Sequence, residues 1–139
     1  MTLVATLVSD SKFATISFEE SKRAVVLKFK VGYVPIETFM KVMEEIEAFA
    51  KKERVAKMVF DKSNMTVFHQ PSMEWYHTVW KVRMLERGLK SYRKILPNDR
   101  LFQESVKIGR EKIKKNNPQF DFNKFDIHYC NSLEEALQD

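Results

Sequence analysis

Hydrophobic residues recur along the chain with two different periods, one of two residues and one of three to four. Alternating or continuous apolar segments of strand length occupy residues 13–18, 23–31, 55–60, 90–96 and 125–129. Apolar positions three and four residues apart, with charged residues between them, occupy residues 36–50, 71–88, 99–115 and 132–137. The first period is typical of β-strands and the second of amphipathic helices, so the pattern predicts five strands and four helices.

The order of these elements predicts an α/β fold, β-β-α-β-α-β-α-β-α, with a mixed sheet of about five strands and helices packed on it. The short polar connection between the first two strands favours an antiparallel hairpin. The strand at 55–60 is apolar on both sides, which is typical of an interior strand. We interpret residues 1–139 as one domain, with residues 1–11 as a loose N-terminal arm or a short edge strand.

Single residues mark where the helices begin, end and pack. Pro35 suits the first turn of a helix, and Gly88 suits a left-handed helix cap. Gly109 lies on the apolar side of the third helix, where it would let the backbone approach a neighbour closely. Ser132 and Glu135 have the spacing of a capping box for the last helix.

The composition of the chain limits its expected location and its expected partners. No apolar run approaches the roughly 20 residues of a membrane-spanning helix, so we expect no membrane span. The single cysteine, Cys130, excludes an internal disulfide and fits a reducing cytoplasm, which is the expected location. The net charge of +5 brings nucleic acid into consideration as a partner. Many of the basic residues lie on predicted helix faces, and the glycine-aromatic signatures of RNA-binding sheets are missing, so the pattern favours a solvated surface.

Signatures of catalysis, metal binding and cofactor binding are missing from the sequence. Three glycines cannot form a glycine-rich phosphate loop. His69 and His77 are eight residues apart, which does not match the usual zinc-ligand spacing, and Cys130 has no basic neighbour in sequence to activate it. We therefore expect no metal, no cofactor and a structural cysteine. A non-enzymatic protein is the leading hypothesis, and a small enzyme using Asp61 and His69 as acid and base is the alternative.

Asp61 and Ser63 form one candidate site, because they follow a central strand at the end where open α/β sheets bind ligands. The simpler interpretation, which we favour, is that both side chains bond to backbone amides of their turn. A phosphate on Ser63 would add negative charge that Lys62, Arg83 and Arg87 could pair with.

Aromatic residues concentrate in the second helix and the loop before it, at Phe68, His69, Trp75, Tyr76 and Trp80. Core packing accounts for part of this group. Two apolar stripes run along the helix, however: one contains Trp75, Val79 and Val82, and the other Tyr76, Trp80 and Met84. A helix needs only one such stripe to pack on a sheet, so the pattern predicts a homodimer interface or a small apolar-ligand pocket centred on Trp75, Tyr76 and Trp80.

Residues 13–139 resemble the STAS domains of anti-sigma-factor antagonists and the SEC14-like proteins grouped with them. The resemblance rests on element order, on the strand Met58-Val59-Phe60-Asp61 with its serine-bearing turn, and on the ending Phe125-Asp126-Ile127-His128-Tyr129 followed by Ser132-Leu133-Glu134-Glu135-Ala136. It implies a regulatory or binding module that acts through a protein partner or a small ligand. The SEC14-like branch implies an apolar ligand or lipid.

The STAS resemblance also places Ser63 at the family's phosphoacceptor position. The antagonists carry Asp-Ser-Ser-Gly there, whereas this chain has Asp61-Lys62-Ser63-Asn64. The aspartate and the second serine match, and the first serine and the glycine do not. We therefore do not expect Ser63 to be a routine phosphoacceptor.

Overall fold

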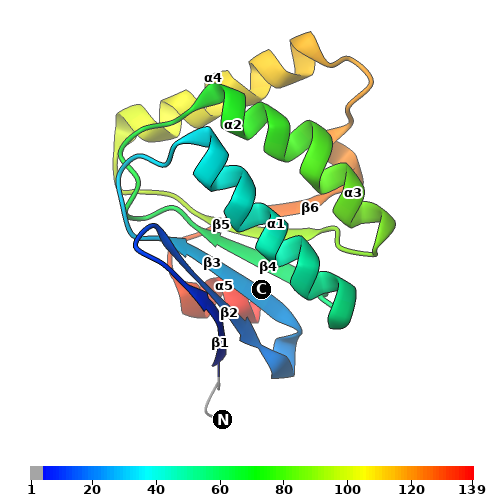
Figure 1. Ribbon diagram of the computed structural model, residues 1–139. Coiled ribbons are helices and arrows are strands. Elements are labelled where there is room, and N and C mark those ends of the chain that lie inside the picture. Colours follow the sequence, from blue (N-terminus) through cyan, green and yellow to red (C-terminus); the bar gives the residue numbers. More distant parts are fainter. Residues whose placement is uncertain (1–4) are drawn as a thin grey trace.

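A mixed sheet of six strands runs through the computed structural model, which describes residues 5–139 (Figure 1). The strands are β1 (Ala5–Asp10), β2 (Ala14–Glu19), β3 (Ala24–Phe29), β4 (Lys57–Asp61), β5 (Ser91–Ile95) and β6 (Asp126–Cys130). Their spatial order follows the chain, from β1 at one edge to β6 at the other. The pairs β1–β2 and β2–β3 are antiparallel, and β3 to β6 are parallel. The predicted hairpin is therefore the pair β2–β3.

Helices cover the two faces of this sheet unequally. They are α1 (Ile36–Lys52), α2 (Gln70–Trp75), a π-helical segment (Tyr76–Trp80), α3 (Lys81–Glu86), α4 (Arg100–Asn116) and α5 (Leu133–Gln138). Two short 3-10 turns span Glu20–Lys22 and Phe122–Lys124. All the longer helices lie on one face, and α5, red in Figure 1, lies on the other. None of the helices in residues 5–139 combines the length and the apolar character needed to cross a membrane.

The general α/β architecture is confirmed, but the predicted strand count and element order are wrong. The structure has three strands before the first helix instead of two. The additional strand is β1, which pairs with β2 and contains a register shift between Leu7 and Ser9. Most of its residues are exposed, so they carry no inward-facing apolar pattern. The interpretation of residues 5–10 as an edge strand is therefore correct and that of a loose arm is wrong; residues 1–4 lie outside the described part.

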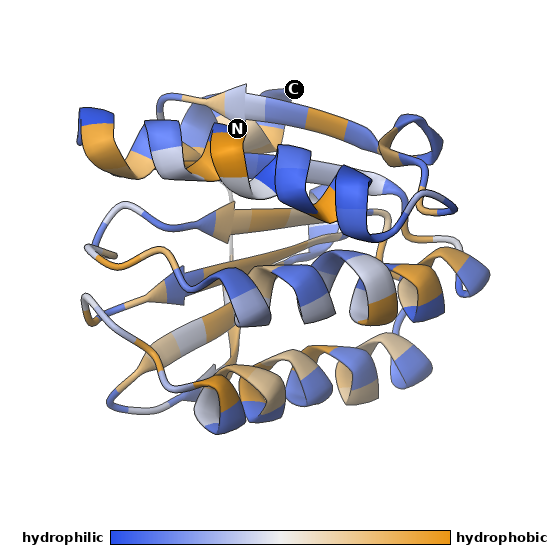
Figure 2. Ribbon diagram, turned by 90° about the horizontal axis from the view of Figure 1, so that it is seen from above, coloured by the Kyte–Doolittle hydropathy of each residue, from blue (hydrophilic) through white to orange (hydrophobic). Residues whose placement is uncertain are grey.

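The core is divided by the sheet into a large and a small layer. On β3, Val25, Leu27 and Phe29 face the large layer under α1 to α4, whereas Ala24 and Val26 face the small layer under α5. Seen from above, the helices alternate between hydrophobic and hydrophilic stretches along their length (Figure 2). Cys130 is buried in the small layer, consistent with the predicted structural role.

The second predicted helix is continuous in space but has a π-helical centre. The π-helical turn is wider than an α-turn and shifts the side chains that follow it. Two neighbouring pairs, Tyr76 with His77 and Trp80 with Lys81, are consequently all buried. The helix ends at Gly88, whose φ of 93° confirms the predicted left-handed cap.

Two further local predictions are confirmed by contacts. A Cβ atom on Gly109 would lie 2.4 Å from the Phe68 ring, so only glycine fits where α4 crosses the loop before α2. Ser132 Oγ accepts from the Glu135 amide at 3.1 Å and caps α5. The Glu135 carboxylate reaches back to the Asn131 amide at 2.9 Å, one residue before the cap.

Candidate functional site

Asp61 and Ser63 form a local turn at the carboxyl end of β4. The Asp61 carboxylate accepts a hydrogen bond from the Ser63 amide at 2.9 Å, and the Asp61 side chain is buried while Ser63 is exposed. This is the turn contact that the simpler interpretation predicted, so it is confirmed for Asp61.

The basic residues proposed to pair with a phosphate on Ser63 do not gather around it. Lys62 is buried, with its Nζ 3.4 Å from Met73 Sδ. Arg83 forms an ion pair with Glu47 of α1 at 3.2 Å. Arg87 follows α3 and precedes β5. Because β4 and β5 are parallel, Arg87 lies toward the amino ends of these strands, whereas Ser63 lies at the carboxyl end of β4. The pairing of a phosphate on Ser63 with these three residues stays a prediction that their positions do not support.

Asp61 and His69 are also held in separate local contacts. His69 caps α2: its Nδ1 lies 2.8 Å from Ser72 Oγ and 3.3 Å from the Ser72 amide. No hydrogen bond joins it to Asp61 anywhere in residues 5–139. Phe68 and His69 do line a small cavity, but its volume is about 10 Å³. That is about the space of one water molecule, too little for the predicted apolar ligand.

The aromatic residues of the second helix belong mainly to the core. Tyr76 and Trp80 are each 0 % exposed, and the Trp80 indole donates to the Met43 carbonyl at 2.9 Å. Trp75 is half-buried and meets Phe39 edge-on, with 6.1 Å between ring centroids. The prediction that Tyr76 and Trp80 face an interface is wrong, because both rings are fully buried. A homodimer through Trp75, Val79 and Val82 stays a prediction.

Beside these aromatic rings lies a group of buried positive side chains that the sequence analysis missed. Lys62, Lys81 and Lys94 are 2 %, 0 % and 2 % exposed. Their Nζ atoms contact aromatic faces: that of Lys81 lies 4.3 Å from the Tyr92 ring centroid, and that of Lys94 lies 5.3 Å from the Tyr76 centroid. None of the three takes part in an ion pair within the described residues. We call these three residues the lysine cluster.

Burial makes the charged form of these lysines unfavourable. It lowers the pKa of Lys62 to about 7, with Arg110 contributing further. Burial and then the positive charges nearby lower the pKa of Lys81 and of Lys94 well below the ordinary value for lysine. The cluster is therefore partly neutral near pH 7.

Several polar atoms around the cluster have no hydrogen-bond partner within residues 5–139. They are the Tyr76 and Tyr92 hydroxyls, His77 Nδ1 and Lys81 Nζ. Burial lowers the pKa of His77 well below its ordinary value and raises the pKa of both tyrosines. Buried polar atoms in proteins are nearly always paired, and unpaired ones concentrate where water, an ion or a ligand belongs.

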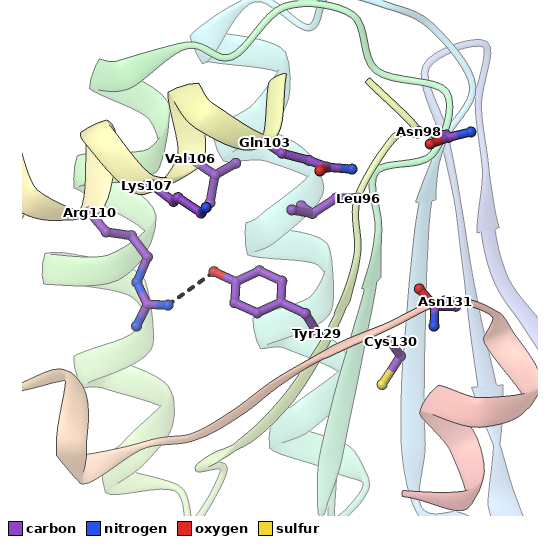
Figure 3. A pocket seen from close by; sticks show the side chains of 9 residues that line it. All are labelled: Leu96, Asn98, Gln103, Val106, Lys107, Arg110, Tyr129, Cys130 and Asn131. Carbon is purple, nitrogen blue, oxygen red and sulfur yellow. Dashed lines mark hydrogen bonds between the residues drawn. The ribbon is translucent and has the colours of Figure 1, made fainter. Parts of the chain in front are cut away.

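A cavity of about 600 Å³ opens next to the cluster, between α4 and the carboxyl ends of β5 and β6 (Figure 3). Its lining residues are Leu96, Asn98, Gln103, Val106, Lys107, Arg110, Tyr129, Cys130 and Asn131. Figure 3 shows the Arg110 guanidinium reaching from α4 to the Tyr129 hydroxyl, a hydrogen bond of 3.0 Å. The same guanidinium lies over the Phe122 ring at 4.5 Å.

The strand register connects one member of the lysine cluster, Lys94, with this cavity. Lys94 of β5 is paired with Tyr129 of β6 on one side and with Phe60 of β4 on the other. Tyr129 lines the cavity, so the buried Lys94 is one strand away from the cavity wall. Arg110 is the second link, since it lines the cavity and its charge lowers the pKa of all three lysines.

The opposite face of β5 carries a separate charged network. Arg93 is buried and donates to the Asp126 carboxylate at 3.0 Å, and its Nε lies 2.9 Å from the Asp139 carboxylate. The hydrogen bond from Arg93 lowers the pKa of Asp126, and the contact with His128 lowers the pKa of Asp139. Every charge in this network has a partner of opposite sign. Among residues 5–139, no group of three acidic, histidine or cysteine side chains is arranged to hold a metal ion.

The chain matches no protein-family model, no curated protein and no solved structure. The STAS or SEC14-like resemblance and the role of Ser63 therefore stay predictions.

A sequence signal for the lysine cluster did exist. Lys62 lies two residues after Phe60 and four after Met58, so it falls on the same inward-facing side as they do. Lys94 lies two residues after Tyr92 and falls on the inward-facing side of its strand for the same reason. Polar residues in phase with a buried pattern mark a site more sharply than aromatic residues do.

Proposed function

We propose that the chain is a non-enzymatic binding module whose small ligand occupies the cavity between α4 and the carboxyl ends of β5 and β6. The observation that carries this proposal is the cavity itself, about 600 Å³ in volume and lined by hydrogen-bonding side chains. That volume lies within the usual range for small-molecule sites. Its position outside the carboxyl ends of parallel strands is the usual ligand position in open α/β sheets.

The side chains that line the cavity provide both apolar surface and hydrogen-bonding groups, as binding sites for small molecules do. Leu96 and Val106 provide apolar surface, while Asn98, Gln103 and Asn131 provide amide groups. Gln103 already donates to the Pro97 carbonyl at 3.1 Å, which fixes its position at the rim. A ligand in this cavity would meet both kinds of surface.

The same lining offers no constellation for covalent catalysis. Cys130 is its only thiol, and burial raises the pKa of that thiol, which disfavours the nucleophilic thiolate. Tyr129 bonds to Arg110 rather than to a base. The proposal therefore keeps the predicted binding role and moves the site away from Asp61, His69 and the tryptophans.

The test is a fragment screen by protein NMR, with the wild type and one cavity-filling variant. Fragments that bind are expected to shift the amide resonances of Leu96, Tyr129 and Asn131. Asn98→Trp places an indole in the cavity from an exposed position and should abolish these shifts. Asn123→Trp adds the same ring at an exposed position outside the cavity and should retain them. A screen whose hits all shift resonances elsewhere would contradict the proposal.

A further inference from the structure

The positively charged side chains around the cavity have few carboxylate partners. Arg110 carries five N–H donors, and the hydrogen bond to Tyr129 uses one of them. No carboxylate forms an ion pair with Arg110 in the described chain. Lys107, the other cation of the lining, meets Glu104 at 3.7 Å in an exposed pair. A guanidinium with free, coplanar donors is the group that binds carboxylates and phosphates in two-pronged fashion.

The lysine cluster adds to this positive field from inside the protein in proportion to the fraction of its amines that is protonated. Water and salt screen the charge of an exposed lysine, whereas the charge of a buried lysine acts on its neighbours through a medium of low dielectric constant. Three buried lysines beside one arginine would normally be accompanied by carboxylates, as Arg93 is by Asp126 and Asp139 on the other face. Here the compensating negative charge is missing from residues 5–139. The open space closest to Lys94 along the strand register is the cavity beyond Tyr129.

We propose that the ligand of this cavity is a small oxyanion, a carboxylate or a phosphate monoester, whose oxygens bind Arg110 and whose charge faces the lysine cluster across Tyr129. This inference rests on the proposed ligand site and adds the chemical class of the ligand. The Tyr129 ring in the cavity wall supplies a surface on which the apolar part of such a compound can pack. Leu96 and Val106 extend that apolar surface.

An anion in this position would change the protonation of the cluster. The groups that face the cluster, taken element by element, are Lys62 after β4, Tyr76 and His77 in the π-helical segment, Lys81 in α3, Tyr92 and Lys94 in β5, Arg110 in α4 and Tyr129 in β6. The charges that act on the pKa of the three lysines are all positive. A nearby negative charge favours the ammonium form and raises the lysine pKa. Oxyanion binding near neutral pH should therefore be accompanied by proton uptake.

The experiment uses phenyl phosphate, benzoate and benzyl alcohol as probes, so that an aromatic ring is presented with two kinds of oxyanion or with a neutral group. Binding is measured by isothermal titration calorimetry at pH 7.5 in two buffers of different ionisation enthalpy, which yields the number of protons taken up. The two anions are expected to bind at least about tenfold more tightly than benzyl alcohol, and to take up protons. The stronger of the two identifies phosphate or carboxylate as the preferred group.

Three variants separate the parts of the proposal. Arg110→Gln removes the two-pronged donor and should weaken anion binding at least about tenfold, with little effect on benzyl alcohol. Lys94→Met keeps the length of the side chain and removes its amine, so proton uptake should fall. Lys112→Gln removes an exposed charge of the same helix that does not line the cavity, and should leave both quantities unchanged.

Two results would overturn the oxyanion class. One is benzyl alcohol binding in the cavity as tightly as the anions, which would leave the proposed ligand site intact. The other is anion binding that is unaffected in Arg110→Gln and reduced in Lys112→Gln, which would assign it to the surface lysines of α4. The ligand site itself would fail differently, with the cavity resonances unchanged by every probe and by the whole fragment set.

Discussion

Trp80 and Lys81 are neighbours in the chain, both are 0 % exposed, and they belong to opposite halves of the large core layer. Trp80 faces the α1 half, where its indole donates to the Met43 carbonyl. Lys81 faces the half over β5 and β6, where its amine meets the Tyr92 and Phe125 rings and finds no hydrogen-bond partner within residues 5–139. The polar atom of Trp80 is thus paired, whereas Lys81 Nζ and the Tyr92 hydroxyl beside it have no hydrogen-bond partner in the described part of the chain.

The contrast between these two halves indicates which one maintains the fold and which one is available for a ligand. Paired and closely packed residues stabilise the native state, and their replacement is expected to destabilise it. Buried unpaired cations do the opposite, because their desolvation favours the unfolded chain. Residues that lower stability in the absence of a ligand are typical of functional sites. Substitutions in the two halves should therefore have effects of opposite sign.

The largest effect is expected for Trp80→Ala in the paired half. Loss of a fully buried indole and its hydrogen bond should reduce the free energy of unfolding by about 3–5 kcal/mol. Urea denaturation followed by circular dichroism measures this value. Trp75→Ala, at a half-buried position on the same helix, should lower it clearly less. Equal losses for the two variants would contradict the division of the helix into a core side and a solvent side.

The next effect concerns pH and the unpaired half. Because the folded-state pKa of Lys62 is about 7 and the unfolded value is near 10.5, the unfolded chain binds more protons between these two values. Stability should therefore rise with pH from about 7 to 9.5, by up to about 1.4 kcal/mol per pH unit for each such lysine. Urea denaturation at several pH values measures the slope. In Lys62→Met the slope should decrease, and a wild-type stability that falls over this range would contradict the burial of the cluster.

Replacing the unpaired ammonium itself should stabilise the protein. Lys81→Met has a similar length and no charge, so it should raise the free energy of unfolding at pH 7 by about 1–3 kcal/mol. The gain should shrink toward pH 9.5, where Lys81 is neutral more of the time in both states. Lys107→Met, at an exposed position, provides the matched control and should change stability little. A destabilised Lys81→Met would mean that the aromatic contacts of the ammonium outweigh its desolvation.

The smallest effect is expected at the contact between α4 and the loop before α2. In Gly109→Ala, the new methyl group would lie 2.4 Å from the Phe68 ring and 2.7 Å from Gln70 Oε1. Overpacking costs about 1–3 kcal/mol, and the better helix propensity of alanine offsets up to about 1 kcal/mol of that. A net loss of about 1 kcal/mol in thermal or urea unfolding is expected. An unchanged or raised stability would show that this contact relaxes freely.

The sequence predicted the α/β framework well because its signals are local. Pro35, Gly88 and the Ser132–Glu135 cap act within a few residues, and the periodic apolar positions define each helix and most strands. The edge strand β1 was ambiguous, since an exposed strand needs no inward-facing pattern. The predicted aromatic interface failed for a different reason. The helix packs the stripe of Tyr76, Trp80 and Met84 on the sheet, so the two rings of that stripe belong to the core.

The candidate site was harder to predict because it depends on pairing between distant elements. Lys62, Lys81, Lys94 and Arg110 come from four separate segments, and only Lys62 and Lys94 are in phase with a buried strand pattern. The strand register, which sets Lys94 beside Tyr129, and the position of Arg110 in α4 connect the lysines with the cavity. By contrast, Asp61 occupied the expected end of its strand, but a contact with its own turn satisfies its carboxylate.

The most direct test of the central claim is an NMR titration of the lysine side chains, with labelled Cε atoms, from pH 5 to 11. The resonances of Lys62, Lys81 and Lys94, assigned with the three Lys→Met variants, are expected to titrate far below the ordinary lysine value, with Lys62 near 7. Saturating phenyl phosphate should move these midpoints upward. Midpoints at the ordinary value for all three lysines, unchanged by phenyl phosphate, would contradict a buried cationic cluster beside an oxyanion site.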